Sequence, residues 1–130
     1  MSETDPGAEA IVREFWRLMA SNDFAAVKTV LGDGFVVEWP QSKERIVGAE
    51  NFVRMNAEYP AHGPWRFTIN RLVASGEQVV TQVSVSDGVQ QAEPVSFFTV
   101  RGGKIVAMVE YWPEPFEAVQ NRRHLVERMG

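Results

Sequence analysis

Four long apolar segments, separated by glycine-containing turns, make up most of the second half of the chain. The segments span residues 65–74, 78–85, 90–100 and 104–112. Their separators are dipeptides typical of tight hairpin turns: Ser75-Gly76, Asp87-Gly88 and Gly102-Gly103. Tight turns join neighbouring strands that run in opposite directions. The pattern therefore predicts an antiparallel meander rather than a parallel sheet.

The first 32 residues predict a helical hairpin. Asp5-Pro6 favours a helix start, because a carboxylate can cap the first turn and proline fits its first position. Apolar residues then recur at helical spacing: Ala8, Ile11, Val12, Phe15, Leu18 and Met19. A polar break at residues 21–23 precedes a shorter helix, which Gly32 is expected to end.

The rest of the chain predicts one short strand and two more helices. Segment 35–39 is apolar and stops at Pro40, whereas the polar segment 41–46 predicts a loop. Gly48 is expected to open a helix that Tyr59-Pro60 ends, and a partly amphipathic helix is expected over 116–129. The sequence contains no linker, repeat or low-complexity tract. We therefore expect residues 1–130 to form a single domain.

This order of elements predicts an α+β fold, in which helices cover the concave face of a strongly bent antiparallel sheet. Segment 90–100 has apolar residues on both faces, with Val95 and Phe97 on one and Phe98 and Val100 on the other. The inner face would line a cavity. An apolar outer face of this size would require other cover and indicates a homodimer.

Composition excludes several kinds of partner. The net charge of −4 and the lack of basic runs argue against nucleic acid, and no apolar run approaches the roughly 18 residues of a membrane span. The absence of cysteine excludes disulfides and thiolate sites and fits a cytoplasmic location. The N-terminal ten residues are acidic and do not resemble a signal peptide. The two histidines stand in unrelated contexts, so we expect no metal and no cofactor.

The order of elements resembles that of the nuclear transport factor 2-like superfamily, and in particular its SnoaL-like (polyketide-cyclase-like) branch. The segments that carry the resemblance are SNDFAAVKTVLGDGFVVEWP, the glycine before the third helix, and GGKIVAMVEYW. The resemblance implies a cone-shaped, cystatin-like α+β barrel with a deep apolar pocket and a dimer through the sheet. Because the superfamily includes isomerases, cyclases, epoxide hydrolases, dehydratases and non-catalytic modules, the fold leaves the function open.

Residue matching within this resemblance argues against two activities. Ketosteroid isomerases of the superfamily use a tyrosine and a protonated aspartate to hold an oxyanion, and a second aspartate to move the proton. The matching positions are Phe15, Ser96 and Trp39, so all three acid/base groups are missing. The Asp-Arg-Asp arrangement of the epoxide hydrolases cannot be assembled either.

Glu110 is the candidate catalytic residue. It shares a strand face with Met108 and Trp112, and the resemblance implies that this face lines the cavity. Burial among apolar groups would raise the pKa of this carboxyl and suit it to general acid/base catalysis. The alternative is a structural ion pair with Arg71 or Arg45.

The candidate ligand-binding residues are Phe15, Trp39, Tyr59, Gln82, Ser96, Phe98, Met108 and Trp112. The aromatic members would hold a ring system, and Gln82 and Ser96 would donate hydrogen bonds to it. Trp16 and Trp65 are expected in ordinary core packing. Glu38, one residue before Trp39, is expected to point away from the pocket.

Two functions remain open. The first is a cofactor-independent isomerase, cyclase, hydratase or dehydratase that acts on an apolar, ring-bearing small molecule. The second is a non-catalytic dimeric module that binds a metabolite or a partner protein. An open cavity of a few hundred cubic ångströms that contains Glu110 would favour the first, and a cone plugged by Trp39, Trp65 and Trp112 would favour the second.

Overall fold

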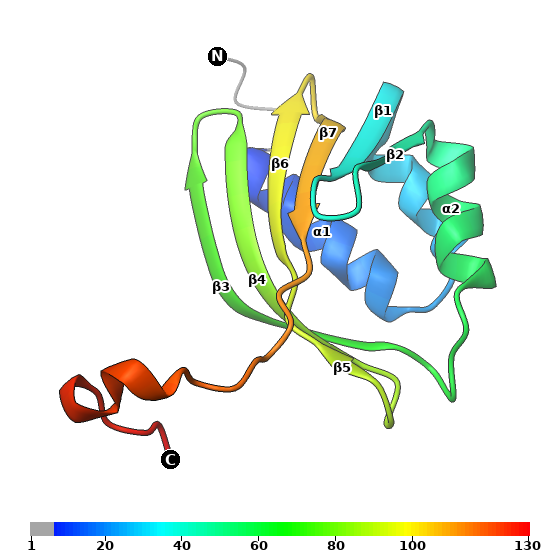
Figure 1. Cartoon of the computed structure of the whole chain (residues 1–130). Helices are drawn as coiled ribbons and strands as arrows, with labels where there is room; N and C mark the ends of the chain where they lie inside the picture. Colours follow the sequence, from blue (N-terminus) through cyan, green and yellow to red (C-terminus); the bar gives the residue numbers. More distant parts are fainter. Residues whose placement is uncertain (1–6) are drawn as a thin grey trace.

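The computed structural model describes residues 7–130, so the expected helix start at Asp5-Pro6 lies outside the described residues. One strongly curved sheet runs in the order β2-β1-β7-β6-β4-β3, with β5 beside β4 (Figure 1). Its strands are β1 (Leu31–Trp39), β2 (Glu44–Val47), β3 (Arg66–Ser75), β4 (Gln78–Ser86), β5 (Gln91–Ala92), β6 (Val95–Arg101) and β7 (Lys104–Tyr111). The α+β fold is confirmed, but the barrel is open, since β2 and β3 are the two ends of this order.

Helices α1 (Ala8–Ala20) and α2 (Ala49–Glu58) lie on the concave side of this sheet (Figure 1). Gly48 precedes α2 with a φ of 88°, a backbone conformation that a residue without a Cβ adopts readily. Tyr59 is extended, as the following proline requires, and α2 ends there. Both predicted helix boundaries of α2 are therefore confirmed.

The predicted meander is confirmed, because β3, β4, β6 and β7 pair antiparallel with their neighbours. The expectation of a purely antiparallel sheet is wrong. Strand β1 pairs in parallel with β7, and Val37 lies opposite Met108. Parallel neighbours need a long connection, and here α2 and the rest of the meander separate the two strands along the chain.

Two further corrections concern the first half of the chain. Segment 41–46 is only partly a loop, since β2 begins at Glu44 and buries Ile46. Gly32 does not end a helix: the 3₁₀ helix η1 (Phe24–Val30) passes directly into β1 at Leu31. A Cβ on Gly32 would lie 3.2 Å from the Cβ of Lys104, so this glycine permits the close approach of β1 to β7.

The second half requires two corrections as well. Segment 90–100 is divided at Glu93-Pro94 into β5 and β6, because proline cannot donate a hydrogen bond to the strand ladder. The helix expected over 116–129 is absent apart from one short 3₁₀ helix, η2 (Gln120–Leu125). All residues from 113 to 130 are exposed, so this segment lacks the tertiary contacts that stabilise most helices.

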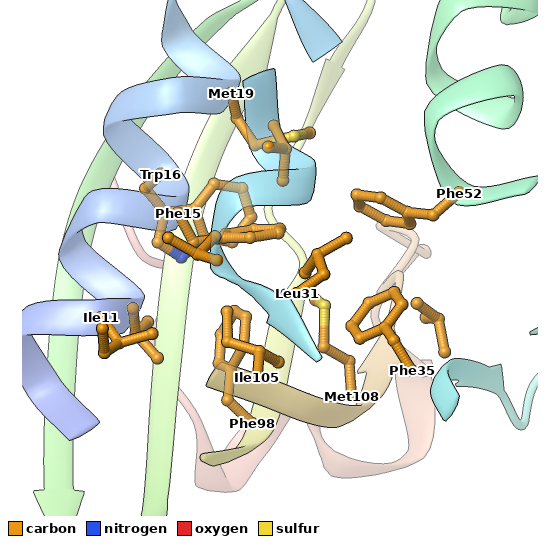
Figure 2. Packing of buried hydrophobic residues seen from close by; sticks show 14 of the residues in the cluster. Ile11, Phe15, Trp16, Met19, Leu31, Phe35, Phe52, Phe98, Ile105 and Met108 are labelled. Atoms are coloured by element: carbon orange, nitrogen blue, oxygen red, sulfur yellow. The ribbon is translucent and has the colours of Figure 1, made fainter. Parts of the chain in front are cut away.

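The core lies between α1, α2 and the concave sheet face (Figure 2). Phe98 on β6 is fully buried, and its ring lies edge-on to Phe15 at a centroid distance of 5.3 Å. Phe52 on α2 contacts Phe35 on β1 in the same way at 5.5 Å. These aromatic contacts fix both helices against the concave face of the sheet.

Candidate functional site

A cavity of about 220 Å³ lies between the two helices and the concave sheet face. Half of its lining residues are aromatic, and they include all four tryptophans of the chain: Trp16, Trp39, Trp65 and Trp112. Glu110 is the only acidic group among the described residues that line it. Three amide side chains, Asn56, Gln90 and Gln91, complete its polar surface. The cavity thus combines large apolar faces with few polar groups, as small-molecule sites do.

Glu110 lies at the cavity end of β7 and is only 5% exposed. Ser96 Oγ donates a hydrogen bond to Glu110 Oε2 at 2.7 Å, and Trp39 Nε1 donates one to Oε1 at 3.1 Å. Burial raises the pKa of Glu110, and the side chains of Ser96, Trp39 and Trp112 only partly oppose this rise. The Glu110 carboxyl therefore stays protonated to a higher pH than an exposed glutamate does.

The alternative of a structural ion pair is not observed within residues 7–130. Arg45 Nη2 lies 2.7 Å from Glu38 Oε2, on the side of β1 that faces away from the cavity, and Arg71 is exposed on β3. This arrangement agrees with the expected outward orientation of Glu38. The described residues thus give Glu110 neutral donors instead of a cation.

The register of the sheet explains this local arrangement. Thr81 on β4 lies opposite Ser96 on β6, which lies opposite Glu110 on β7. At the other end of this polar row, Trp16 Nε1 donates to Thr81 Oγ1 at 3.2 Å. Across the described residues, every buried side-chain polar atom has a hydrogen-bond partner. The row therefore holds Glu110 in place without strain from unpaired groups.

Five of the predicted site residues lie on the cavity wall: Glu110, Phe15, Trp39, Tyr59 and Trp112. Trp39 and Trp112 are mutually perpendicular, with centroids 6.4 Å apart, and flank the carboxyl on one side. The wall positions of these five residues follow from the structure, while their roles toward a ligand stay predictions.

The remaining four predicted ligand-binding residues lie elsewhere. Gln82 alternates with buried Thr81 and Val83, so it lies on the convex face, and its placement in the pocket is wrong. Phe98 and Met108 are almost wholly buried and line the closed core, not the cavity.

Ser96 is fully buried behind Glu110, and its one hydroxyl hydrogen is used in the hydrogen bond to that carboxyl. The expectation that Ser96 donates a hydrogen bond to the ligand is therefore wrong.

Several cavity residues were not expected from the sequence. Trp16 and Trp65 line the cavity in addition to packing against the core. Asn22, which has a left-handed φ of 62°, fixes Trp65 by two hydrogen bonds of 2.8 Å to its backbone N and O. On α2, the spacing of Phe52, Met55, Asn56 and Tyr59 is the i, i+3, i+4, i+7 signature of one helix face, and it could have identified this part of the wall.

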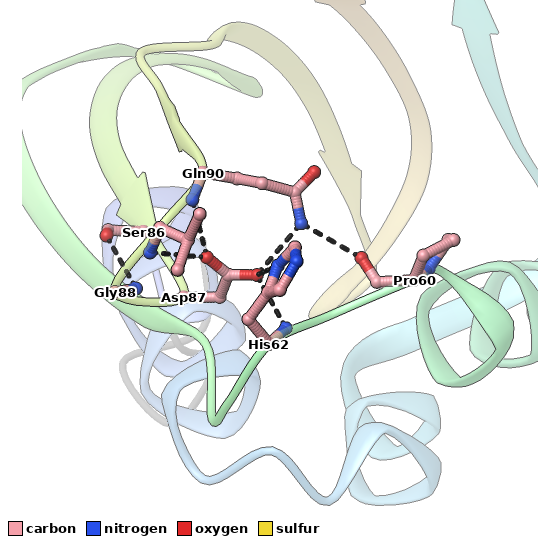
Figure 3. Close-up of polar contacts among 7 residues, drawn as sticks. Pro60, His62, Ser86, Asp87, Gly88 and Gln90 are labelled. Carbon is pink, nitrogen blue, oxygen red and sulfur yellow. Dashed lines mark hydrogen bonds and ion pairs between the residues drawn. The ribbon is translucent and has the colours of Figure 1, made fainter.

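Asp87 organises the cavity mouth (Figure 3). Its carboxylate accepts hydrogen bonds from the backbone N–H groups of His62, Val89 and Gln90, and Gln90 Nε2 bridges Asp87 to the carbonyl of Pro60. Burial alone would raise the pKa of Asp87, but these donors outweigh it and hold the pKa well below its usual range. The network joins the α2–β3 connection to the β4–β5 turn, and Gln90 is part of the cavity wall.

His62 Nδ1 lies 3.2 Å from Asp87 Oδ2, but the ring is 58% exposed and is not part of the cavity wall. Residues 7–130 contain no cluster of three or more potential metal-ligating side chains. In the same range, none of the helices combines the length and the apolar character that a membrane crossing requires.

Comparison with known proteins identifies the family. The SnoaL-like domain model matches residues 12–108. The chain therefore belongs to the SnoaL-like domain family. No curated protein sequence gives a significant match.

Two solved structures support the assignment of this SnoaL-like domain. A candidate ketosteroid isomerase from Kribbella flavida DSM 17836 is 31% identical, with a TM-score of 0.86 over 95% of this chain and 90% of that one. A nuclear transport factor 2-like protein of unknown function from Burkholderia xenovorans LB400 is 30% identical, with a TM-score of 0.76 over 95% of each chain. A SnoaL-like polyketide cyclase candidate from Jannaschia sp. CCS1, 19% identical with a TM-score of 0.64 over 86% of this chain and 91% of that one, shares the fold.

Proposed function

We propose that this SnoaL-like protein binds an apolar, ring-bearing small molecule in the cavity and that Glu110 acts on it as a general acid or base without a cofactor. The reaction class is isomerisation, cyclisation, hydration or dehydration. The observation that carries the proposal is a single carboxyl with a raised pKa on the wall of an open, aromatic cavity. The cavity is lined rather than filled by its tryptophans, which favours this function over a non-catalytic module.

The environment of Glu110 suits it to proton transfer. As a neutral acid it can donate its proton to a ligand carbonyl or leaving oxygen, and as a carboxylate it can take a proton from carbon. Trp39 and Ser96 hold the carboxyl from opposite sides, so the group that reacts is already oriented. The side-chain oxygens of Asn56 and Gln90 can accept hydrogen bonds from polar substituents of the ring system, while Gln90 Nε2 is already used by Asp87 and the Pro60 carbonyl.

The proposal does not extend to steroid isomerisation by the known acid/base set. The three positions that match that set carry Phe15, Trp39 and Ser96. Of these, Phe15 has no acid/base group, and the polar hydrogens of Trp39 and Ser96 are directed to Glu110. The name given to the Kribbella relative describes that protein and is not transferred to this chain.

Glu110→Gln tests the proposed role directly. Turnover of a panel of aromatic and alicyclic ketones and alcohols is followed by NMR in the wild type, in Glu110→Gln and in the matched control Glu38→Gln. Loss of a proton-transferring group is expected to reduce turnover by about 10²–10⁴-fold in Glu110→Gln, while ligand binding and the control activity persist. Equal turnover by wild type and Glu110→Gln would refute the role assigned to Glu110.

We also propose that the protein is a homodimer that uses the convex sheet face. Phe97 is 43% exposed and Tyr111 is 40% exposed, and their rings contact each other at 6.1 Å on neighbouring strands. Val73 on the edge strand β3 extends this apolar surface. Exposed apolar surface that spans several strands indicates a protein contact. A cytoplasmic location stays part of the proposal.

A further inference from the structure

We propose that the C-terminal arm, residues 113–130, of each copy lies on the convex sheet face of a second copy of this chain. The inference rests on the proposed homodimer and adds the second half of its interface. It assigns a role to a segment that neither the core nor the cavity uses.

The arm has large apolar side chains and no contact that buries them. Phe116, Leu125 and Met129 are 83%, 76% and 97% exposed, and every residue from 113 to 130 is exposed. Within residues 7–130, no hydrogen bond or ion pair joins this segment to the rest of the chain. Side chains of this size on one short segment indicate a protein surface that is absent from the single copy.

The convex face is the matching surface. The strand register places Val73, Val80, Phe97 and Val109 in one row across β3, β4, β6 and β7. A second row on the same face contains Tyr111, the last residue of β7. The first row thus crosses the meander, and its exposed members are Val73 on the edge strand β3 and Phe97 on β6.

The arm and the face are continuous in the chain. Tyr111 belongs to the face, Trp112 is held by Gln41 through its backbone N and O, and the arm starts at the next residue. Figure 1 shows the arm leaving the end of β7 and extending past β3, away from the sheet of its own copy. Its course therefore directs the arm toward a neighbouring molecule rather than back over its own face.

Two-fold symmetry makes this arrangement self-consistent. In a symmetric pair, each copy contributes one arm and one convex face, so the arm of each copy covers the convex face of the other. Trp112 is both the anchor of the arm and part of the cavity wall. Docking of the arm on the partner would thus also fix one side of the cavity.

Light scattering on the full chain tests the arm directly. The double variant Phe116→Ser/Leu125→Ser alters only the arm, and Phe97→Lys alters only the face. Val89→Ser is the control, at a 68% exposed valine in the β4–β5 turn. We expect dimers for wild type and control, and at least a tenfold weaker dimer for the arm variant and for the face variant. If the arm variant dimerises as tightly as wild type, the inference about the arm is wrong, but the proposed homodimer is retained. A monomeric wild type would contradict both the homodimer and the docking of the arm.

Cross-linking establishes which chain the arm contacts. Because the sequence has no cysteine, Leu125→Cys on one chain and Val73→Cys on another supply the only thiols in a mixture. A short bis-maleimide is expected to yield a mixed cross-linked dimer. A third chain carries both substitutions, Leu125→Cys and Val73→Cys. If its two thiols cross-link within one chain, at monomer mass, the arm folds back onto its own copy and the inference is wrong. Neither result depends on turnover by Glu110, so the catalytic proposal is tested separately.

Discussion

Glu110 is surrounded by side chains from separate parts of the chain. Trp39 belongs to β1, Ser96 to β6, and Trp112 directly follows β7. The side of β7 on which Glu110 lies could be predicted, because Glu110 shares a strand face with Met108 and Trp112 and the family resemblance implies that this face lines the cavity. Its partners could not, because the pairing of Ser96 with Glu110 depends on the register between two strands and Trp39 approaches from a third.

Gln82 shows why another site position was misplaced. Strand β4 has valines on both faces at its start, at Val79 and Val80, so this part of the strand does not identify the inner side. The inner position is occupied by a polar residue, Thr81, which Trp16 satisfies with a hydrogen bond. The alternation of Val83 and Val85 with Gln82, Ser84 and Ser86 nevertheless indicates that Gln82 lies outside, so this position could have been placed correctly from the sequence.

Glu110→Gln is also expected to change the pH dependence of stability. A raised pKa means that the folded protein binds this proton more tightly than the unfolded chain does. The wild type therefore loses stability as the pH rises from the ordinary glutamate pKa through the raised one, by about 1.4 kcal/mol per unit of elevation. A neutral glutamine removes this loss.

Urea unfolding between about pH 4 and pH 9 measures this effect. The stability of Glu110→Gln relative to wild type should increase with pH, whereas the control Glu38→Gln should lack this trend. A difference between Glu110→Gln and wild type that stays constant over the whole range would contradict the raised pKa.

At the scale of secondary structure, the periodic elements were predictable and the context-dependent ones were not. α1, α2 and the meander have strong apolar periodicity or turn residues, and all are present. Strand β2 buries only Ile46, so a polar segment gave no strand signal. The helix expected over 116–129 was a wrong prediction. Its sequence has apolar residues, but these have no surface of the same copy to pack against.

The connection between the α2–β3 loop and the β4–β5 turn depends on Asp87. Asp87→Asn is expected to loosen both segments, because an amide has one acceptor oxygen where the carboxylate has two. Hydrogen exchange should become faster in residues 60–64 and 87–92 and stay unchanged in α1. Asp33→Asn, at an exposed position in β1, is the control.

The sign of the pH dependence follows from the lowered pKa of Asp87. Its contribution to stability is present above the ordinary aspartate pKa and is lost as the pH falls toward the lowered one. The stability difference between wild type and Asp87→Asn should therefore shrink in acid. A difference that grows on acidification would show that the carboxylate is not the stabilising form.

For the whole molecule, the curved sheet with helices on its concave face could be predicted from the order of elements. The parallel pairing of β1 with β7 could not, since it joins segments about 70 residues apart with no local signal. The proposed position of the arm could not be predicted from local patterns either, because the proposal places it on a surface of a second copy.

The proposed dimer predicts a melting temperature that depends on protein concentration. Association stabilises the folded state by mass action, so the apparent Tm of the wild type should rise over a hundredfold increase in concentration. Thermal unfolding followed by circular dichroism measures this rise. The Phe116→Ser/Leu125→Ser variant should show a smaller rise, and a wild-type Tm independent of concentration would contradict dimerisation.

The lining of the cavity by every tryptophan has a practical consequence. Indole emission responds to local polarity and to nearby quenchers, and all four indoles of this chain lie at the same hollow. A compound that enters therefore changes the surroundings of indole rings on the cavity wall. Intrinsic tryptophan fluorescence can therefore report ligand binding, and compound libraries can be screened with it before any reaction is known.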